Sequence, residues 1–425
     1  MWLLKDTPAL LTDLYELTMA QVYFKKRMAE TAYFEVYIRK LPENWGFFVM
    51  AGLDEVESFL REFRFSEADI DYLRSTRLFA EDFLHYLATF EPDVKIRSLP
   101  EGTLFFPDEP VMEVAGPLIC AQLLESYILN ILGFSIIQAT LATRISLAAK
   151  NAVVVDFGLR RCQGPVASLR SARAAQMAGF RATSNVFAAR QLDFTASGTM
   201  AHSFVHVHES QEEAFRSFAE AYGEDSILLV DTYDSIEGIK QAAELARQFF
   251  KEKNVKLRGI RIDSGDLVKL SKFAREHFRQ QGVCFLKIFV SGDLDEFAIE
   301  DLLSHGAEVD GFGVGTRLAV SRLAPAVEIV YKIVQYGEKA VFKTSPGKQT
   351  RPGRKTIKRV KEKHYRRDII SPLKSETDDL LKPFESAEKM PTIQQRLTVE
   401  LSALDDSIKA IRNPGKYAIE FARIS

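Results

Sequence analysis

The sequence predicts an α/β protein whose central part is a parallel β-sheet, either open or closed into a barrel. From about residue 140 to 335, short apolar runs end in polar or glycine-rich turns, and amphipathic helical stretches follow them. Three of these runs end at Asp231, Asp263 and Asp293, at intervals of about 30 residues, which is the length of one strand–helix unit. Repeated units of this kind place the strands parallel, so polar residues at their carboxyl ends are expected along one edge of the sheet.

Five apolar runs predict the strands of this sheet. The runs AVVVDFG, ILLVD, LRGIRID, CFLKIFVSGD and AEVDGFGVGT end near Asp156, Asp231, Asp263, Asp293 and Thr316. Helices are predicted at 236–251, 266–281 and 294–305, after the second, third and fourth runs. This alternation assigns residues 136–340 to one βα domain.

The first 135 residues predict a small α+β domain of mixed helices and strands. Helices are expected at 12–27, 53–63 and 118–132, the last ending at Gly133, and strands at 31–39, 94–97 and 103–105. Residues 341–425 are expected to hold a basic loop and a last helix near 392–411. Parts of 340–425 are expected to join the first domain, 1–135.

Composition excludes several classes of protein. The chain has 425 residues, 46% hydrophobic and 27% charged, which is ordinary globular usage, and its net charge of −2 argues against a general nucleic-acid binder. Three cysteines without a CxxC pair exclude a zinc ribbon and a thioredoxin-like centre, and favour a reducing, cytoplasmic compartment. The amino-terminal stretch lacks the pattern of a signal peptide. The apolar stretch 126–143 contains polar residues that favour a buried core helix over a membrane span.

A basic run follows the βα domain. Residues 343–367 contain eleven lysines or arginines and one acid, Glu362. The segment TSPGKQTRPGRK within it has no helical or strand period and predicts a loop. This loop is either a solvated flap or a segment that closes over bound phosphates.

Paired acids and glycine-rich turns follow the later strands. DTYD at 231–234 and RIDSGD at 261–266 each place two carboxylates beside a strand end. Such residues either cap helices or hold Mg²⁺ with a polyphosphate or a ribose, and their repetition makes capping alone a weaker explanation. SGD at 291–293 and GFGVGT at 311–316 allow close backbone approach, and their amides predict a phosphate site.

Two further groups of residues leave alternatives open. His202, His206 and His208 are either Zn²⁺ ligands, without an HExxH pattern or a nearby thiol, or structural and acid–base groups. In DFGLRR at 156–161, Phe157 either packs in the core or stacks on a flat ring. The two arginines of this motif either form surface ion pairs or hold an anion.

Taken together, these residues resemble the nicotinate phosphoribosyltransferase family. The resemblance extends through most of residues 10–355 and lies in ordered motifs: TDLYELTMAQVYF, AYFEVYIRKLPENWGFFVMAGL, VDFGLRRCQG, GFRATSN, GTMAHS, VDTYDS, RIDSGDL, VSGDLDE and GFGVGT. The basic segment SPGKQTRPGRK is also similar, whereas the tail 370–425 is less diagnostic. The resemblance implies an irregular βα barrel of the type II phosphoribosyltransferase kind with an N-terminal α+β domain.

The resemblance also implies a reaction and its partners. Nicotinate attacks C1 of phosphoribosyl pyrophosphate, which gives nicotinate mononucleotide and pyrophosphate, with ATP hydrolysis coupled and Mg²⁺ required. A homodimer with an active site shared between subunits is implied, and neither nucleic acid nor a membrane is expected as a partner.

Roles for individual residues follow from matching positions in the family motifs. His202 matches the histidine that ATP phosphorylates, and Asp231 would accept a hydrogen bond from its other ring nitrogen. Phe157 would stack on one face of the pyridine ring, and the partner subunit's Tyr15 on the other. Ser184 would donate to the nicotinate carboxylate, where the related nicotinamide enzyme has an aspartate.

The remaining matched residues are implied to hold the phosphoribosyl donor. Arg160 and Arg261 would hold substrate anions near the ring and the ribose, and Asp263 and Asp266 would face the ribose, Mg²⁺ or pyrophosphate. The ribose and its 5′-phosphate are assigned to a set from the last two strand ends, which consists of Gly292, Asp293, Gly313, Gly315 and Thr316.

Three alternatives remain at this point. The first is another pyridine phosphoribosyltransferase, acting on nicotinamide or quinolinate. The second is a metal-dependent barrel hydrolase that uses His202, His206 and an aspartate, which tightly bound zinc would support. The third is a non-catalytic phosphate or nucleotide sensor, which would bind phosphoribosyl pyrophosphate without releasing pyrophosphate.

Overall fold

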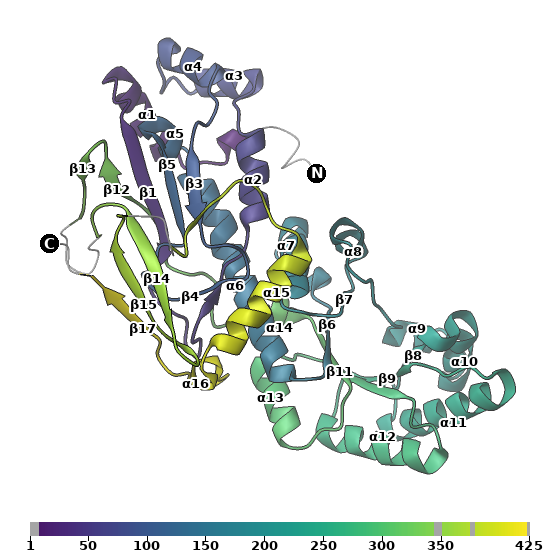
Figure 1. Ribbon diagram of the computed structural model, residues 1–425. Coiled ribbons are helices and arrows are strands. Elements are labelled where there is room, and N and C mark those ends of the chain that lie inside the picture. The colour runs from purple at the N-terminus through teal and green to yellow at the C-terminus, as the bar shows by residue number, and fades with distance from the viewer. Residues whose placement is uncertain (1–7, 344–350, 375–378, 423–425) are drawn as a thin grey trace. The chain divides into compact units, whose positions relative to one another are not determined.

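The computed structural model describes residues 8–343, 351–374 and 379–422 (Figure 1). The chain divides into two compact units, one of residues 1–137 and 326–425 and one of residues 138–325. Unit 1 therefore combines both ends of the chain, and unit 2 is the continuous segment between them. The change from unit 1 to unit 2 falls within the long helix α6 (Glu125–Ala149).

Unit 2 is built on a six-stranded parallel sheet in the order β7-β6-β11-β10-β9-β8. Its strands are β6 (Val153–Asp156), β7 (Ala182–Thr183), β8 (Ile227–Leu229), β9 (Gly259–Ile262), β10 (Lys287–Val290) and β11 (Gly311–Val314). Its helices and helical turns are η2 (Leu159–Arg161), α7 (Pro165–Met177), α8 (Val186–Leu192), α9 (His202–His206), α10 (Gln211–Tyr222), η3 (Gly223–Asp225), α11 (Ser235–Lys253), α12 (Leu267–Gln281), α13 (Glu296–Ser304) and α14 (Thr316–Ala319). The curled parallel sheet confirms the predicted α/β fold with an irregular βα barrel.

Helix starts in unit 2 follow from the residues that precede them. Asp234, Asp266 and Asp295 cap α11, α12 and α13, and each side chain accepts a hydrogen bond from a backbone amide of the first turn. Residues on one side of the sheet are fully buried, among them Ile260, Ile288 and Phe312. Successive residues of a strand face opposite sides of the sheet. The residues that directly follow these three, Arg261, Phe289 and Gly313, therefore face the other side, where they line a cavity.

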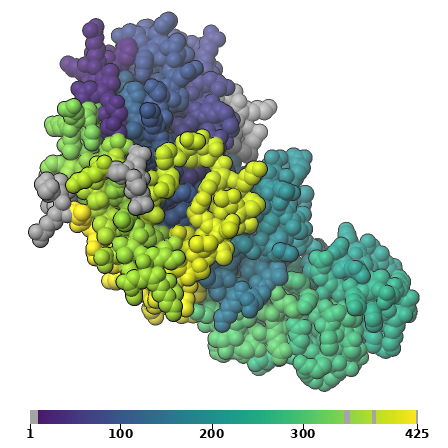
Figure 2. All heavy atoms as spheres, viewed as in Figure 1, coloured from purple at the N-terminus to yellow at the C-terminus, as the bar shows by residue number. Residues whose placement is uncertain are grey.

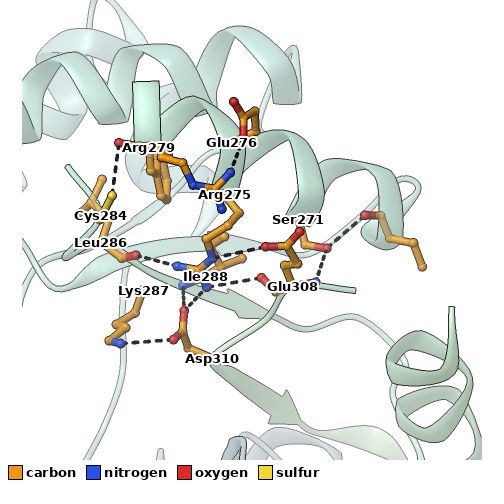
Figure 3. Close-up of polar contacts among 12 residues, drawn as sticks. Ser271, Arg275, Glu276, Arg279, Cys284, Leu286, Lys287, Ile288, Glu308 and Asp310 are labelled. Atoms are coloured by element: carbon orange, nitrogen blue, oxygen red, sulfur yellow. Dashed lines mark hydrogen bonds and ion pairs between the residues drawn. The ribbon is translucent and has the colours of Figure 1, made fainter. Parts of the chain in front are cut away.

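The amino ends of β10 and β11 are held by the carboxylate of Asp310 (Figure 3). This carboxylate accepts from Arg275 of α12 at 2.6 Å, from the Ile288 amide at 2.9 Å and from Lys287 at 3.2 Å. Ser271, also on α12, accepts a hydrogen bond from the backbone amide of Glu308. These contacts hold α12 against the amino ends of β10 and β11.

Unit 1 contains a six-stranded sheet in the order β13-β12-β1-β5-β3-β16. These strands are β1 (Thr31–Ile38), β3 (Lys95–Ser98), β5 (Met112–Pro117), β12 (Ile329–Tyr336), β13 (Lys339–Ala340) and β16 (Lys382–Pro383). Smaller sheets pair β2 (Phe48–Val49) with β4 (Leu104–Phe105), and β14 (Lys355–Lys361) with β15 (Tyr365–Pro372) and β17 (Ala418–Phe421). The helices, besides α6, are η1 (Pro8–Leu10), α1 (Leu14–Lys25), α2 (Leu53–Glu62), α3 (Glu67–Ser75), α4 (Glu81–Ala88), α5 (Leu118–Gln122), α15 (Met390–Ala403) and α16 (Asp406–Lys409).

The carboxyl-terminal segment is part of unit 1. It is yellow in Figure 2, where it lies next to blue atoms of the amino-terminal part. The pairing of β16 with β3 and the contact between α15 and β4 join the two segments. The last predicted helix is shorter than expected, because α15 ends at Ala403 and α16 forms a separate turn.

Two sequence predictions in this region are wrong. Gly133 does not end a helix, since α6 continues through it to Ala149. One glycine in a helix costs about 1 kcal/mol, which the burial of flanking residues such as Ile131 and Ile136 outweighs. Strand β12, expected to fall in the βα domain, pairs instead with β1 of unit 1.

The basic run is partly structural. Residues 344–350, which include most of the predicted loop, lie outside the described residues. Beyond them, Lys355 binds Glu35 at 2.7 Å and Arg354 binds Glu113 at 2.6 Å, and both acids are buried. Removing one partner of such a buried pair costs about 3–5 kcal/mol. These two cations are therefore neither a solvated flap nor free to bind phosphate.

One apolar stretch has the length of a membrane span. Within the described part of the chain, residues Leu118–Ala149 pass that test with a mean hydropathy of 1.5, and 67% of the most apolar window is buried by protein. A buried core helix has the same properties.

Candidate active site

The polar residues singled out in the sequence gather along the carboxyl edge of the unit 2 sheet. Because all six strands are parallel, the segments that follow them all begin at the same edge of the sheet, its carboxyl edge. The predicted residues at this edge, in chain order, are Phe157, Arg160, Ser184, Asp231, Asp263, Gly292, Asp293, Gly315 and Thr316.

A chain of hydrogen bonds links the ends of β8, β9 and β10. One carboxylate oxygen of Asp231 accepts from the Asp263 amide at 3.0 Å and from the Ser264 hydroxyl at 2.6 Å. The Asp263 carboxylate in turn accepts from Ser291. The other oxygen of Asp231 is buried and has no hydrogen-bond partner among the described residues.

Arg261 supplies a half-buried cation beside these carboxylates. Its guanidinium donates to the Met200 carbonyl at 3.1 Å and lies 5.8 Å from the centre of the Phe157 ring. Burial lowers the pKa of Arg261, and the charges of Asp263 and Asp231 oppose this shift. Its Nε is buried without a hydrogen-bond partner in the described part of the chain. The site thus holds one unmatched donor and one unmatched acceptor, which a polar ligand can complete.

Two glycines of the GFGVGT motif have a packing role that the sequence did not predict. A Cβ on Gly313 would lie 2.4 Å from the Phe157 ring, and one on Gly311 would lie 2.8 Å from the Phe289 ring. Both glycines lie inside β11 and make room for two aromatic rings over the sheet. Only Gly315 lies beyond the strand end, as a phosphate-binding turn requires.

Gly292 is constrained in two ways. Its φ is +100°, and an added Cβ would lie 2.1 Å from the carbonyl oxygen of Asp263. The next residue, Asp293, pairs with Arg317, which donates at 2.6 Å from Nε and lowers the pKa of that carboxyl. Sequence reasoning missed Arg317, although it directly follows Thr316 in the quoted motif.

His202 lies on the short helix α9, and its Nδ1 is 3.1 Å from the hydroxyl of Thr232. The predicted hydrogen bond from His202 to Asp231 is not present in this structure, where Nδ1 of His202 faces Thr232 instead. The signal for Thr232 was its place directly after Asp231.

Two other histidines have partners of their own. His206 contacts the Tyr233 hydroxyl at 3.3 Å, and His208 contacts the Phe204 carbonyl at 2.8 Å. In the ranges that the structure describes, no three His, Cys, Asp or Glu side chains lie close enough to hold a metal ion.

Two other predicted site residues are described separately. Asp266 is exposed, caps α12 and pairs with Lys269 at 2.9 Å, so the capping interpretation holds for it. Tyr15 belongs to α1 of unit 1 and is 45% exposed.

A cavity of about 530 Å³ lies on the concave side of the sheet, lined by Phe157, Arg261 and Gly313 among others. Its size is within the usual range for small-molecule sites. A parallel sheet with polar residues at its carboxyl edge and a cavity on one face is the arrangement of an α/β enzyme that binds a small molecule at the strand ends.

Comparisons with known proteins agree with this class. Residues 10–133 match the family model for the nicotinate phosphoribosyltransferase (NAPRTase) N-terminal domain, and residues 152–369 match the model for the NAPRTase family. Nicotinate phosphoribosyltransferase pncB2 of Mycobacterium tuberculosis is 44% identical over 354 residues, which cover 83% of this chain and 76% of the relative. The Bacillus subtilis enzyme is 38% identical over 363 residues, covering 84% and 74%.

Solved structures give the same result. Human nicotinic acid phosphoribosyltransferase superposes with a TM-score of 0.84 at 25% identity and covers 97% of both chains. Nicotinate-nucleotide pyrophosphorylase from Pyrococcus furiosus has a TM-score of 0.75 at 28% identity, covering 93% of this chain and 95% of that chain. This chain belongs to the nicotinate phosphoribosyltransferase family, so it transfers phosphoribosyl from phosphoribosyl pyrophosphate to nicotinate in NAD biosynthesis.

Replacement of Gly313 by alanine tests the packing of Phe157. The added methyl group must displace the ring, so we expect Gly313→Ala to raise the KM for nicotinate on the order of 10-fold. Gly133→Ala, in the middle of α6, is the control: its added methyl group meets the Ile329 side chain at 3.3 Å, and that KM should stay near the unsubstituted value. Steady-state kinetics give the nicotinate KM of both variants. A KM in Gly313→Ala equal to that of the control would contradict a contact between the Phe157 ring and nicotinate.

Proposed function

We propose that phosphoribosyl transfer by this chain is coupled to ATP through phosphorylation of His202. The observation that supports it is the place of His202 beside Thr232, next to the linked carboxylates of Asp231 and Asp263. Nδ1 of the ring faces the Thr232 hydroxyl, and Nε2 has no hydrogen-bond partner among the described residues. Nε2 is therefore the nitrogen that attacks the γ-phosphorus of ATP, forming an N–P bond while the bond to ADP breaks.

The transfer step uses the residues of the carboxyl edge. The pyridine nitrogen of nicotinate attacks C1 of the ribose while the bond from C1 to pyrophosphate breaks. As this bond breaks, positive charge builds on the ribose, and the negative carboxylates of Asp231 and Asp263 stabilise it. Arg160 and Arg261 bind substrate anions, and Phe157 stacks on the pyridine ring and orients its nitrogen.

Magnesium is proposed to enter with the pyrophosphate group. The residues fit one carboxylate ligand, Asp263, beside the unmatched oxygen of Asp231, and Mg²⁺ commonly takes few protein carboxylates together with phosphate oxygens. When bound, it stabilises the negative charge of the leaving group. Asp266 does not fit this role, because its carboxylate caps α12 and pairs with Lys269.

The 5′-phosphate is assigned to the turns after β10 and β11. Gly292, Gly315 and Thr316 offer backbone approach there, and Arg317 offers a cation beside Asp293. The hydrolase alternative needs a cluster of metal ligands, and the described residues contain none.

Loss of His202 tests the coupling. Formation of nicotinate mononucleotide is measured with nicotinate, phosphoribosyl pyrophosphate and Mg²⁺, with and without ATP, and again after EDTA. His202→Ala should abolish the stimulation by ATP and keep a slow transfer, because the substrates still meet at the sheet edge. His206→Ala, on the same short helix, is the control and should keep the stimulation. Undiminished ATP stimulation in His202→Ala would refute the phosphohistidine.

Ser184 is proposed to donate to the nicotinate carboxylate. It follows β7 at the carboxyl edge and is partly exposed. An aspartate there repels a carboxylate, so Ser184→Asp should raise the KM for nicotinate by at least about 10-fold. Its effect on turnover of nicotinamide should be much smaller, and an equal loss with both pyridines would count against the contact.

We propose that the active site is completed by the partner subunit's Tyr15, which stacks on the other face of the pyridine. The exposure of Tyr15 makes its ring accessible to a second copy of the chain. Tyr15→Ala and Phe157→Ala proteins should each be weakly active, whereas co-expressed subunits should recover about a quarter of the activity, because half of the dimers then hold one intact site. Absence of recovery in isolated heterodimers would indicate a site within one chain.

A further inference from the structure

A buried polar network lies directly beneath Phe157 and Ser184. The carboxylate of Asp156 accepts from the Thr183 hydroxyl at 2.6 Å and from the Gly158 amide at 2.7 Å. The Thr183 hydroxyl accepts from the Asn185 amide at 3.1 Å, and Asn185 donates to Ser168 of α7 at 3.2 Å. Asp156 is 2% exposed and Thr183 is fully buried.

The network joins the last residues of β6 and β7, which directly precede two turns of the site. Asp156 immediately precedes Phe157, and Thr183 immediately precedes Ser184. The backbone adds a second link, because the Ser184 amide donates to the Asp156 carbonyl at 2.7 Å. The spacing between the Phe157 ring and the Ser184 hydroxyl is therefore set by contacts of Asp156.

Stability alone gives little reason for a carboxylate at this position. In the described part of the chain, Asp156 has no salt bridge, and burial raises its pKa. A buried carboxylate without a cation is costly, whereas an apolar residue of similar size would avoid that cost. Unlike an apolar residue, the Asp156 carboxylate accepts hydrogen bonds from two places at once: the Thr183 hydroxyl and the Gly158 amide.

We infer that Asp156 is a positioning residue for the pyridine substrate, which acts through Thr183 to fix the turn of Phe157 against the turn of Ser184. This inference rests on the proposed roles of Phe157 and Ser184. It assigns no contact between Asp156 and the substrate, and it predicts an effect on nicotinate binding that is separate from binding of the phosphoribosyl donor.

Two substitutions at position 183 test the inference. Thr183→Val keeps the shape and removes the donor, so the KM for nicotinate should rise about 10-fold, while the KM for phosphoribosyl pyrophosphate stays within about twofold. Thr183→Ser keeps the hydroxyl and should restore most of the nicotinate affinity. Thr143→Val is the matched control, because the buried Thr143 hydroxyl donates to the Ala139 carbonyl of its own helix.

The outcomes separate the positioning role from a general loss of stability. An unchanged nicotinate KM in folded Thr183→Val, an equal rise in both KM values, or failure of Thr183→Ser to restore affinity would each overturn the inference. Asp156→Leu, which has a similar size and accepts from neither the Thr183 hydroxyl nor the Gly158 amide, should give the same selective rise. It decides the matter if Thr183→Val does not fold.

Ser184→Ala distinguishes this inference from the proposed function. If Ser184→Ala leaves the nicotinate KM unchanged while Thr183→Val raises it, the Ser184 contact fails and the positioning role stands through Phe157. If Ser184→Ala raises the KM and Thr183→Val does not, the contact stands and the positioning role is overturned.

Discussion

The pairing of β6 with β11 is the interaction on which the site depends. Four residue pairs, from Gly311 with Val153 to Val314 with Asp156, join the first long strand of unit 2 to its last. The Phe157 amide extends this ladder by donating to the Val314 carbonyl at 2.8 Å. Without this parallel register, the Phe157 ring would not lie over Gly313, and the two ends of unit 2 would not contribute to one edge.

Much of unit 2 could be predicted because its signals are local. Apolar runs of strand length and aspartates at helix starts both act within a few residues, and parallel topology then brings the strand ends together. The two acids of RIDSGD show the limit of this reasoning. Asp263 ends a strand and joins the hydrogen-bonded chain of the site, whereas Asp266 directly precedes a helix and caps it. Position relative to the helix start separates these roles, and the residue type does not.

The errors of prediction arise where distant segments decide the structure. Lys355 is one of many cations in a basic run, and only the fold brings it to Glu35. In the same way, residues 329–336 fell within the predicted βα domain, and only the tertiary pairing of β12 with β1 places them in unit 1. The GFGVGT motif correctly marked the end of a strand. However, Gly311 and Gly313 also leave room for the rings of Phe289 and Phe157, which only the fold brings there. A single sequence contains no direct signal for such contacts.

The two unmatched polar atoms of the site show how the fold favours binding over its own stability. The buried oxygen of Asp231 and the buried Nε of Arg261 each lack a hydrogen bond among the described residues, at a cost of about 1–3 kcal/mol apiece. The sheet holds both groups in place before any ligand arrives, so little reorganisation is needed when charge develops there. A ligand that supplies the missing partners regains part of this cost, and its binding therefore stabilises unit 2 as well as occupying the site. Burial of polar groups without partners is unfavourable in a core but useful at an edge where a charged substrate completes them.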